Sequence, residues 1–323
     1  MLYIVGLLNH LKRIQSCVAE LEGDAYLNAK DLVLQVRARG KVCHLQPQFT
    51  FVKEGRIRYT AYFEQHVSGF AGWRPYFMKR WPAATEKLLF KRFALEHGLP
   101  TPPFWTSACT EVRDVLIKQN RSSFGVGIRG PFRDLQSPDA ALRPEHDEYY
   151  EAFIPGRVAK AWYWNGGLVC LEVRPMPCLV GDGCSSVAEL AATRSRRPVD
   201  ATALAWLAAF QGRTPAAVLR EGESMLADFK YGTPFDPPCV ENENVLASFA
   251  GSRIEAELRR AGMTSAQAIP KSLRANTLFT LDAVVDDEDR VWFLEMNSNP
   301  MVHPDTYAAI LGSLFEVNIE ASS

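Results

Sequence analysis

The apolar positions of residues 87–96 recur at helical spacing, which predicts an amphipathic helix on one side of a core. The apolar face comprises Leu88, Leu89, Phe93 and Leu95. Gly98 is a typical helix stop, and the three prolines between residues 100 and 103 exclude a continuation of the helix. An ordered α-helical segment is therefore expected just before the middle third of the chain.

Further on, short apolar runs bounded by turn residues predict strands. The strands are expected at 114–120, 148–156, 158–164, 168–174, 277–285 and 291–297. Asn165-Gly166 is a typical hairpin turn between two of them. Ser186 and Glu189 have the spacing of a capping box, so a helix should begin there. Residues 200–260 look mostly helical, and a last helix should follow Pro304.

The first 80 residues give weaker patterns. Residues 28–40 have apolar positions at helical spacing and end on Gly40, which predicts a helix. Residues 41–46 and 56–63 are predicted strands. Helical and strand patterns both occur along the chain.

Composition and charge indicate an ordinary globular protein. The chain has 323 residues, 47% of them hydrophobic and 23% charged, with a formal net charge of −1. This balance gives no electrostatic reason to expect nucleic acid or an anionic membrane as a partner. Seven scattered cysteines fit a reducing compartment better than a disulfide framework. No signal peptide or membrane-spanning run is evident, so we expect a cytoplasmic protein.

Polar residues that end an apolar strand form the first candidate site. Glu295 and Asn297 lie two positions apart and should project from the same face of a strand. If the hairpin of 277–297 turns between Glu288 and Asp289, Asp282 lies opposite Glu295. Two carboxylates and an amide oxygen would suit Mg²⁺ or Mn²⁺ held together with phosphates. The same residues could instead cap a sheet edge, and the hairpin alone leaves both interpretations open.

A lysine and a glycine-containing loop form the second candidate. Lys118 ends an apolar strand, and the loop that follows contains small residues that let backbone N–H groups approach phosphate oxygens. These loop residues are Ser122, Ser123, Gly125 and Gly127. The loop lacks the Walker spacing. Together with the carboxylate hairpin, it indicates ATP binding.

The order of these segments resembles the ATP-grasp carboxylate–amine ligases, the group of D-alanine–D-alanine ligase, glutathione synthetase, cyanophycin synthetase and RimK-like enzymes. The resemblance covers residues 85–307, about two-thirds of the chain. It rests on EKLLFKRFALEHGLPTPPF, VLIKQNRSSFGVGI, YYEAFIPGR, LVGDGCSSVAEL, LDAVV and FLEMNSNP. It implies an ATP-grasp fold with two α+β lobes that grip ATP, preceded by a small α/β N-terminal domain.

The resemblance also implies roles for single residues. Lys87 and Lys118 would hold phosphate oxygens, and the glycine loop would close over them. Glu151 would face the adenine amino group, and the backbone of Phe153 and Ile154 would pair with the ring edge. Asp282, Glu295 and Asn297 would be the metal ligands.

The chain departs from the family at two positions. Val158 stands where many members have a ribose-binding acid. Thr280 stands where many have a phosphate-binding arginine, and Arg274, Lys271 or Lys230 could substitute. We assign Arg274 the catalytic role beside Lys118 as the working hypothesis.

The implied reaction activates a carboxylate as an acyl phosphate with ATP, joins it to an amine, and releases ADP and phosphate. We expect small-molecule or peptide substrates, and neither nucleic acid nor membrane as partners; a homodimer is left open. Domains are expected at 1–80, 81–156 and 157–323. A non-catalytic nucleotide-binding module and a phosphotransferase remain as alternatives.

Other residues have simpler interpretations. Cys178 and Cys184 are expected to be buried and inert. His303 could contact substrate or begin a helix. Arg174 and Lys160 could bind a substrate carboxylate or lie solvated on a strand. The cluster of Trp162 to Trp164 is expected to pack in the core.

Overall fold

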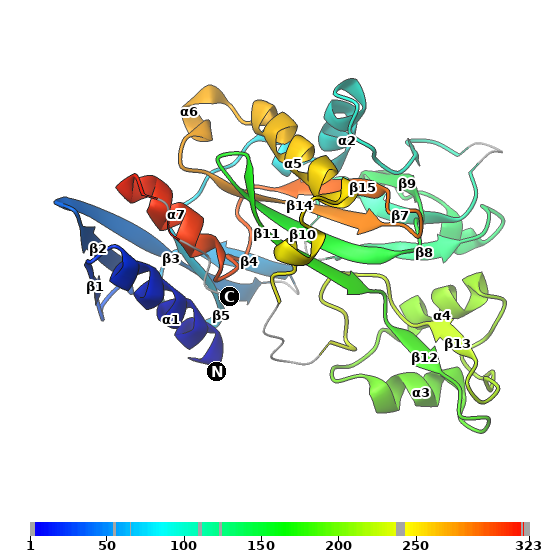
Figure 1. The fold of residues 1–323 in the computed structure, drawn as a ribbon. Coiled ribbons are helices and arrows are strands. Elements are labelled where there is room, and N and C mark those ends of the chain that lie inside the picture. Colours follow the sequence, from blue (N-terminus) through cyan, green and yellow to red (C-terminus); the bar gives the residue numbers. More distant parts are fainter. Residues whose placement is uncertain are drawn as a thin grey trace.

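The computed structural model describes residues 4–53, 56–64, 66–108, 112–122, 125–236, 243–317 and 319. Helices and antiparallel sheets alternate along it, so the predicted α+β class is confirmed (Figure 1). Besides the elements given below, it contains the short helices η1 (Pro82–Ala84), η2 (Pro138–Ala140), η3 (Pro144–His146), η4 (Leu246–Phe249), η5 (Ala266–Ala268) and α6 (Lys271–Arg274).

The N-terminal part is a helix on an antiparallel sheet. Its elements are α1 (Ile4–Glu20), β1 (Asp24–Leu27), β2 (Leu34–Ala38), β3 (Lys41–Lys53), β4 (Arg56–Thr60) and β5 (Val67–Arg74). The long strand β3 pairs with β2, β4 and β5. The sequence did not predict α1, and the predicted helix over 28–40 is wrong. Leu34, Val36 and Ala38 alternate and are buried on one face of β2, because strand pairing overrode the weak helical spacing.

The middle part is a second sheet in the order β6-β9-β7-β8. Its strands are β6 (Phe104–Trp105), β7 (Val115–Gln119), β8 (Arg129–Phe132) and β9 (Glu148–Ala152). Helix α2 (Lys87–Glu96) precedes it, as predicted, and Gly98 follows the helix in a left-handed conformation. The strands predicted at 114–120 and 148–156 are therefore confirmed as β7 and β9. Strand β9 is shorter than predicted and ends at Ala152, before Pro155.

The third sheet has the order β11-β10-β14-β15. Its strands are β10 (Arg157–Trp164), β11 (Gly167–Pro175), β14 (Leu278–Val285) and β15 (Val291–Asn297). Asn165 and Gly166 form the predicted turn, both at positive φ. One face is apolar and packs against α2 and α5 (Arg253–Ser265). The other face carries Lys160, Asp282 and Glu295 and, through Trp162 and Trp164, also joins the largest apolar core.

A small unit projects from the third sheet. It consists of β12 (Cys178–Val180), α3 (Val187–Arg194), α4 (Ala201–Phe210) and β13 (Ser224–Leu226). The capping box of Ser186 and Glu189 is present at the start of α3, as predicted. Residues 200–260 are less helical than expected. Between α4 and α5, the described residues form β13, turns and η4, because several glycines and prolines interrupt the segment.

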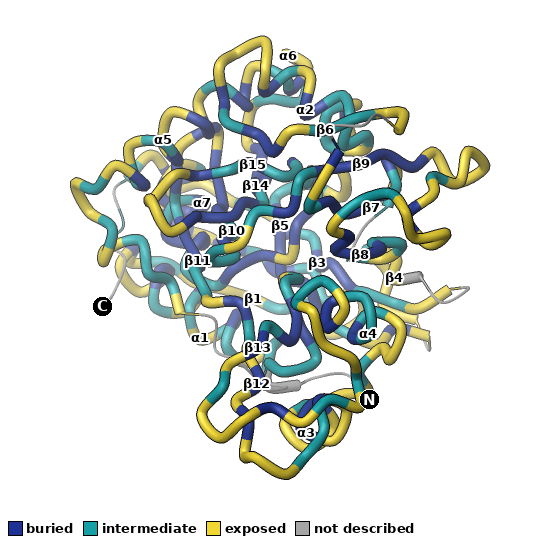
Figure 2. Tube along the Cα trace, turned by 90° about the vertical axis from the view of Figure 1, so that its right-hand side faces the viewer, coloured by how far each residue is buried: buried dark blue, intermediate teal, exposed yellow. Residues whose placement is uncertain are grey.

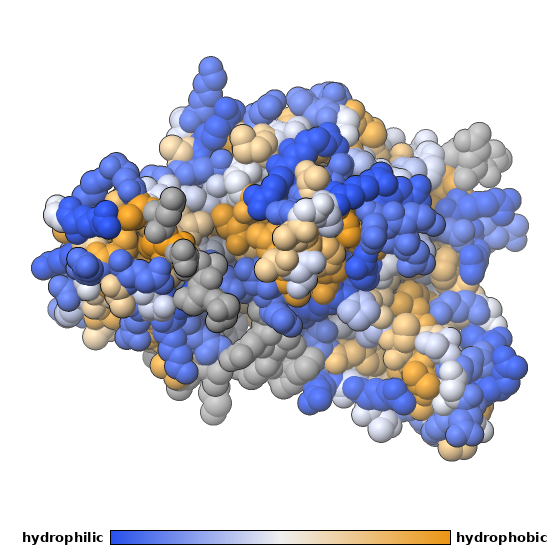
Figure 3. Space-filling model, viewed as in Figure 1, coloured by the Kyte–Doolittle hydropathy of each residue, from blue (hydrophilic) through white to orange (hydrophobic). Residues whose placement is uncertain are grey.

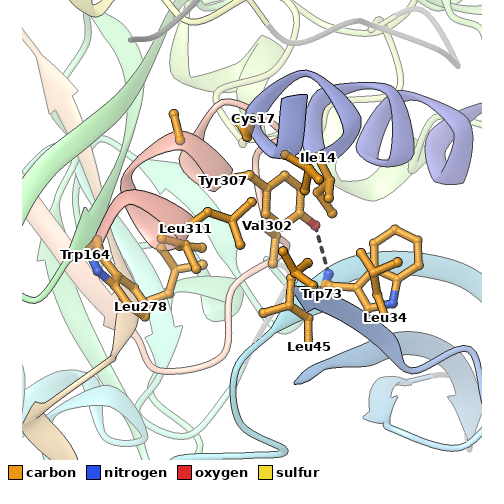
Figure 4. Packing of buried hydrophobic residues seen from close by; sticks show 14 of the residues in the cluster. Ile14, Cys17, Leu34, Leu45, Trp73, Trp164, Leu278, Val302, Tyr307 and Leu311 are labelled. Carbon is orange, nitrogen blue, oxygen red and sulfur yellow. Dashed lines mark hydrogen bonds between the residues drawn. The ribbon is translucent and has the colours of Figure 1, made fainter. Parts of the chain in front are cut away.

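The largest core joins the two ends of the chain. Helix α7 (Thr306–Phe315), the expected C-terminal helix, packs beside α1 against β2, β3 and β5. Figure 4 shows the Tyr307 hydroxyl accepting a hydrogen bond from the Trp73 backbone N–H at 2.9 Å. Trp162 and Trp164 of β10 belong to the same core, which confirms their expected packing role. The N-terminal sheet thus shares its core with the third sheet.

Burial concentrates where the sheets meet. In Figure 2, strands β7, β9 and β14 run as buried segments through the centre, whereas the turns around α3 are exposed at the periphery. On the face in Figure 3, hydrophilic side chains predominate and apolar areas are small and separated. The charged side chains of Lys160, Asp282 and Glu295 on the third sheet are likewise mostly buried.

Candidate active site

The hairpin of β14 and β15 brings the predicted metal ligands together. Asp282 pairs with Glu295, so the predicted register is confirmed at this point. A bulge follows, and Ala283 pairs with Phe293, which leaves Leu294 as the extra residue. The bulge resets the alternation of side chains: Phe293 and Met296 both enter the apolar core, while Glu295 keeps the opposite face.

Each carboxylate of the hairpin lies against a different lysine. Lys160 Nζ lies 2.5 Å from Asp282 Oδ1, and Lys87 Nζ lies 2.9 Å from Glu295 Oε2. Asn297 Nδ2 donates to Asp282 Oδ2 at 3.0 Å. The interpretation of Lys160 as a solvated strand charge is wrong, because its side chain is mostly buried against the hairpin. These four groups and Asn297 form the hairpin cluster.

The pKa values of the two carboxylates in the hairpin cluster are shifted in opposite directions. Burial raises the pKa of Glu295, but the charge and hydrogen bond of Lys87 outweigh burial and lower that pKa to about 2. Burial raises the pKa of Asp282; Lys160 opposes this shift and the neighbouring Glu295 adds to it. Glu295 is therefore ionised at neutral pH in this enclosed place.

Lys118 lies in a second, fully buried charge cluster. Its Nζ is 2.5 Å from Glu151 Oε1, and Lys91 Nζ is 2.6 Å from Glu151 Oε2. Burial raises the pKa of Glu151, but the two lysines outweigh burial and lower it. Both carboxylate oxygens are thus occupied by ammonium groups, which leaves the predicted contact of Glu151 with an adenine amino group without support here.

Lys91 was missed in the sequence, although it could have been found. It follows Lys87 by four residues, so both side chains project from the same face of α2. Asn120 was also missed: its Oδ1 accepts from the Leu88 N–H at 2.9 Å and its carbonyl accepts from the Lys87 N–H at 3.0 Å. Asn120 therefore fixes the start of α2, and with it Lys87, beside the hairpin.

The glycine loop lies close to Lys87. Lys87 Nζ donates to the Ser122 carbonyl and, at 3.3 Å, to the Ser122 hydroxyl. Gly125 lies against the Lys230 side chain, and a Cβ at Gly127 would overlap the Gln119 side chain at 2.7 Å. Ser123, the remaining loop residue of the hypothesis, lies outside the described residues. Ser122 is thus placed beside the lysine that contacts Glu295, whereas Gly125 and Gly127 lie against Lys230 and Gln119.

An apolar cluster lies between the second and third sheets. We call it the interlobe cluster; it contains Leu116, Ile128, Phe153, Ile154, Val158, Met176, Phe210, Leu226, Phe229, Val284 and Leu294. The Phe153 ring lies 5.4 Å from both the Phe210 and the Phe229 ring. The Phe153 N–H donates to the Asp114 carbonyl at 2.7 Å, so this N–H is already engaged and does not support the predicted pairing with an adenine edge.

Arg274 is not brought to the hairpin cluster. Its Nη2 donates to the carbonyls of Gln267 and Ile269 at 3.2 and 3.0 Å, which ties the ends of a turn together. Among the described residues, no hydrogen bond or ion pair joins it to the carboxylates, so its placement gives the catalytic hypothesis no support. Thr280 is buried, and its hydroxyl has no hydrogen-bond partner in the described part of the chain.

The remaining candidate residues are two exposed cysteines, an arginine in an ion pair and a buried histidine. Cys178 and Cys184 are exposed, so the expectation of buried thiols is wrong. Arg174 Nη2 lies 2.6 Å from the buried Glu172 Oε2, so this arginine is not a solvated strand charge. His303 is buried, with its ring 5.4 Å from that of Trp162.

The donor set of the hairpin cluster fits a hard divalent cation. Two carboxylates and one amide, Asp282, Glu295 and Asn297, share one face. No group of three or more His, Cys, Asp or Glu side chains is placed to hold a metal among the described residues. A cation here would therefore need the amide and oxygens from a second ligand such as a phosphate.

None of the described helices has both the length and the apolarity needed to cross a membrane.

No protein-family model matches the sequence, and no curated protein matches it. Solved structures are similar to the chain in shape. A bifunctional glutathione synthetase from Pasteurella multocida is 14% identical, with 94% of this chain and 43% of that chain covered, at a TM-score of 0.40.

D-alanine–D-alanine ligase from Bacillus anthracis, in complex with ATP, is 12% identical, with 74% of this chain and 66% of that chain covered, at a TM-score of 0.38. L-amino acid ligase from Bacillus licheniformis is 11% identical, with 71% and 43% covered, at 0.37. The chain thus spans less than two-thirds of the length of each. The chain is similar to solved ATP-grasp ligases, the group that its motifs resemble.

Proposed function

We propose that the protein is an ATP-dependent ligase that activates a carboxylate as an acyl phosphate and joins it to an amine. One observation carries the proposal. Asp282 and Glu295 lie opposite each other on an inner face, where Lys87 and Lys160 contact them, beside an apolar cluster. Buried carboxylates and lysines in such density suit a ligand with several phosphate charges and a cation.

The nucleotide is proposed to lie across the junction of the second and third sheets. The interlobe cluster offers apolar side chains to the adenine ring. Lys118, and Lys87 at the start of α2, supply ammonium groups to phosphate oxygens. Gly125 and Gly127 let the loop backbone approach the phosphates closely. The ribose has no acidic partner at Val158, so its contacts are left to other groups.

Asp282, Glu295 and Asn297 are the residues that would hold Mg²⁺, or Mn²⁺, together with the nucleotide. The cation would neutralise charge on the terminal phosphates. Lys160 and Lys87, which contact the two carboxylates here, would then be available to phosphate oxygens. Glu295 can act as a ligand at neutral pH because the lysine keeps its pKa low despite burial.

The reaction then needs positioning more than protein nucleophiles. A substrate carboxylate attacks the γ-phosphorus of ATP, the bond to the ADP oxygen breaks, and an acyl phosphate forms. The amine attacks the acyl carbon and expels phosphate, losing a proton as the amide forms. The lysines hold the charge that develops on the phosphoryl oxygens, and enclosure between the sheets keeps water from the acyl phosphate.

A non-catalytic nucleotide-binding module is the alternative from another class. A module that only binds nucleotide has no need for two opposed carboxylates, an amide and their lysines on one inner face. Those groups favour an enzyme. A phosphotransferase shares the first step and differs in the acceptor.

Product analysis tests the proposal. The protein is incubated with ATP, Mg²⁺ and a panel of amino acids and small carboxylates, each with hydroxylamine in place of the amine. We expect a hydroxamate, ADP and phosphate with the correct carboxylate. AMP and pyrophosphate would contradict the acyl-phosphate route. ADP formed without hydroxamate or amide for any pair would favour the phosphotransferase, and failure to bind ATP would overturn the whole proposal.

A further inference from the structure

Arg74, in the part of the chain that sequence motifs left unassigned, is a buried cation without an acidic partner among the residues that the structure describes. It is the last residue of β5, and its relative exposure is 0%. No ion pair joins it to a carboxylate among the described residues. Burial lowers the pKa of the Arg74 guanidinium; Tyr76, which also interacts with it through a side-chain hydrogen bond, opposes this shift, as do Tyr59 and Tyr307. A fully buried charge without a counter-charge is costly, so this position needs an explanation.

One edge of the Arg74 guanidinium is hydrogen-bonded to Asn299, and the other is buried without a hydrogen-bond partner among the described residues. Nη1 donates to Asn299 Oδ1 at 2.8 Å, and the group lies 5.4 Å from the centre of the Tyr76 ring. Nε and Nη2 are buried, and neither has a hydrogen-bond partner in the described part of the chain. These two nitrogens are on the same edge of the guanidinium, and their N–H bonds point in parallel. This edge takes the two oxygens of one carboxylate in a bidentate contact.

Asn299 fixes the held edge. Its Oδ1 also accepts from the Lys79 N–H at 3.1 Å, and its Nδ2 donates to the Lys79 carbonyl at 2.5 Å. Asn299 follows the proposed metal ligand Asn297 by two residues, so the guanidinium is tied directly to the end of β15. Arg74 is thereby oriented by the same segment that supplies the cation ligands.

Tyr59 connects Arg74 with the hairpin cluster. Burial raises the pKa of Tyr59 to about 12; the charge of Arg74 opposes this shift, and the charge of Asp282 adds to it. The tyrosine therefore lies within the electrostatic reach of both. Its strand, β4, is at the end of the N-terminal sheet. The geometric link to the hairpin is Asn299, which accepts from Arg74 and follows the last residue of β15 by two positions.

We propose that the Nε and Nη2 edge of Arg74 binds a carboxylate of the substrate that the protein activates. This inference rests on the proposed ligase function. The anion supplies the missing counter-charge, and its planar pair of oxygens matches the two parallel donors. A phosphate could offer the same oxyanion chemistry, so the two sources have to be separated. Because the guanidinium is buried, the carboxylate binds it in a conformation of the protein in which this edge is accessible.

The test uses the full-length protein and simple anions, without nucleotide. Thermal unfolding is measured in acetate, inorganic phosphate or chloride at equal ionic strength, for the wild type, Arg74→Met and Arg74→Lys. Arg58→Met, an exposed arginine on β4, is the matched control. We expect acetate to stabilise the wild type and the control relative to chloride, Arg74→Lys less, and Arg74→Met not at all.

A second measurement excludes a merely structural role. Replacing an unpaired buried charge by a methionine should leave the unfolding temperature in chloride unchanged or raise it. Once a carboxylate substrate is identified, Arg74→Met should raise its KM roughly ten- to a hundredfold, the range of a charged hydrogen bond, while the KM for ATP stays unchanged.

Three outcomes would overturn the inference. They are stabilisation of the wild type by phosphate but not acetate, an equal response of wild type and Arg74→Met to acetate, and a marked loss of stability in Arg74→Met in chloride. Failure of the proposed function is visible separately, because ATP binding by the wild type is measured apart from the anion response.

Discussion

Asp282 and Glu295 face each other across β14 and β15, and each carboxylate contacts a lysine from a different element, β10 for Asp282 and α2 for Glu295. The bulge at Leu294, directly beside this pair, turns Glu295 away from the apolar core that Phe293 and Met296 enter. Two opposed carboxylates in an enclosed place repel each other, so the arrangement depends on its cations. The hairpin cluster should therefore respond to the removal of a single charge, from either a carboxylate or a lysine.

Glu295→Gln should lower the rate of ADP formation roughly a hundredfold or more, because it removes one charge from the proposed cation ligands. The fold should survive, since the amide is nearly isosteric with the carboxylate. ADP release and circular dichroism check the two statements. Glu288→Gln, at the exposed turn of the same hairpin, is the control and should retain activity. Turnover like that of the wild type in Glu295→Gln would exclude the metal assignment.

Glu151→Gln should destabilise the protein by about 3 kcal/mol or more, because it leaves the ammonium groups of Lys91 and Lys118 buried beside a neutral amide. Lys91→Met should cost much less, since the ion pair of Lys118 and Glu151 remains. Urea unfolding of the two variants gives the comparison. Equal losses would show that the two lysines do not depend on the shared carboxylate.

Trypsin should cleave after Arg121, whose side chain is exposed, more slowly when ATP and Mg²⁺ are present. The reason is that the loop of 121–127 is proposed to close over the phosphates. Cleavage after Arg220, which is also exposed and lies in the small projecting unit, serves as the internal control and should not change. Mass spectrometry of the fragments measures both rates, and equal protection at the two sites would indicate a global effect instead.

Acid should destabilise the protein through His10. Burial, and then the neighbouring His303, lower the pKa of His10 to about 3 from its ordinary 6.5. Between these two pH values the unfolded chain binds a proton and the folded protein does not. The stability contributed by the neutral form is complete above pH 6.5 and falls by about 1.4 kcal/mol per pH unit below it.

His10→Gln should remove this part of the pH dependence. The glutamine retains a polar group near the Tyr307 hydroxyl, which lies 2.8 Å from His10 Nδ1, but it does not titrate. The free energy of unfolding is measured for both proteins from pH 7 down to about pH 4. Parallel curves for the wild type and the variant would show that His10 is not the titrating group.

The sequence predicted turns and helix starts correctly where they depend on residues close together in the chain. The capping box of Ser186 and Glu189 and the turn at Asn165-Gly166 depend on residues a few positions apart, and both are present. The pairing of Asp282 with Glu295 could be predicted because a hairpin fixes its register through its own turn. The bulge could not be predicted, because it depends on which side chains the core accepts.

Contacts between distant segments were decided by the tertiary structure alone. Arg74 and Asn299 are 225 positions apart, and Lys160 reaches Asp282 only because β10 pairs with β14. The wrong prediction of a helix over 28–40 also reflects contacts between segments, because β2 forms by pairing with β1 and β3. The sequence by itself determined where helices and strands form, through the spacing of apolar positions, and that Glu295 and Asn297 project from one face of a strand, because alternate strand residues share a face. The three-dimensional packing decided which cation each carboxylate meets, because burial and charge pairing depend on every segment that surrounds a group. It also buried the Nε and Nη2 edge of Arg74 without a hydrogen-bond partner in the described part of the chain.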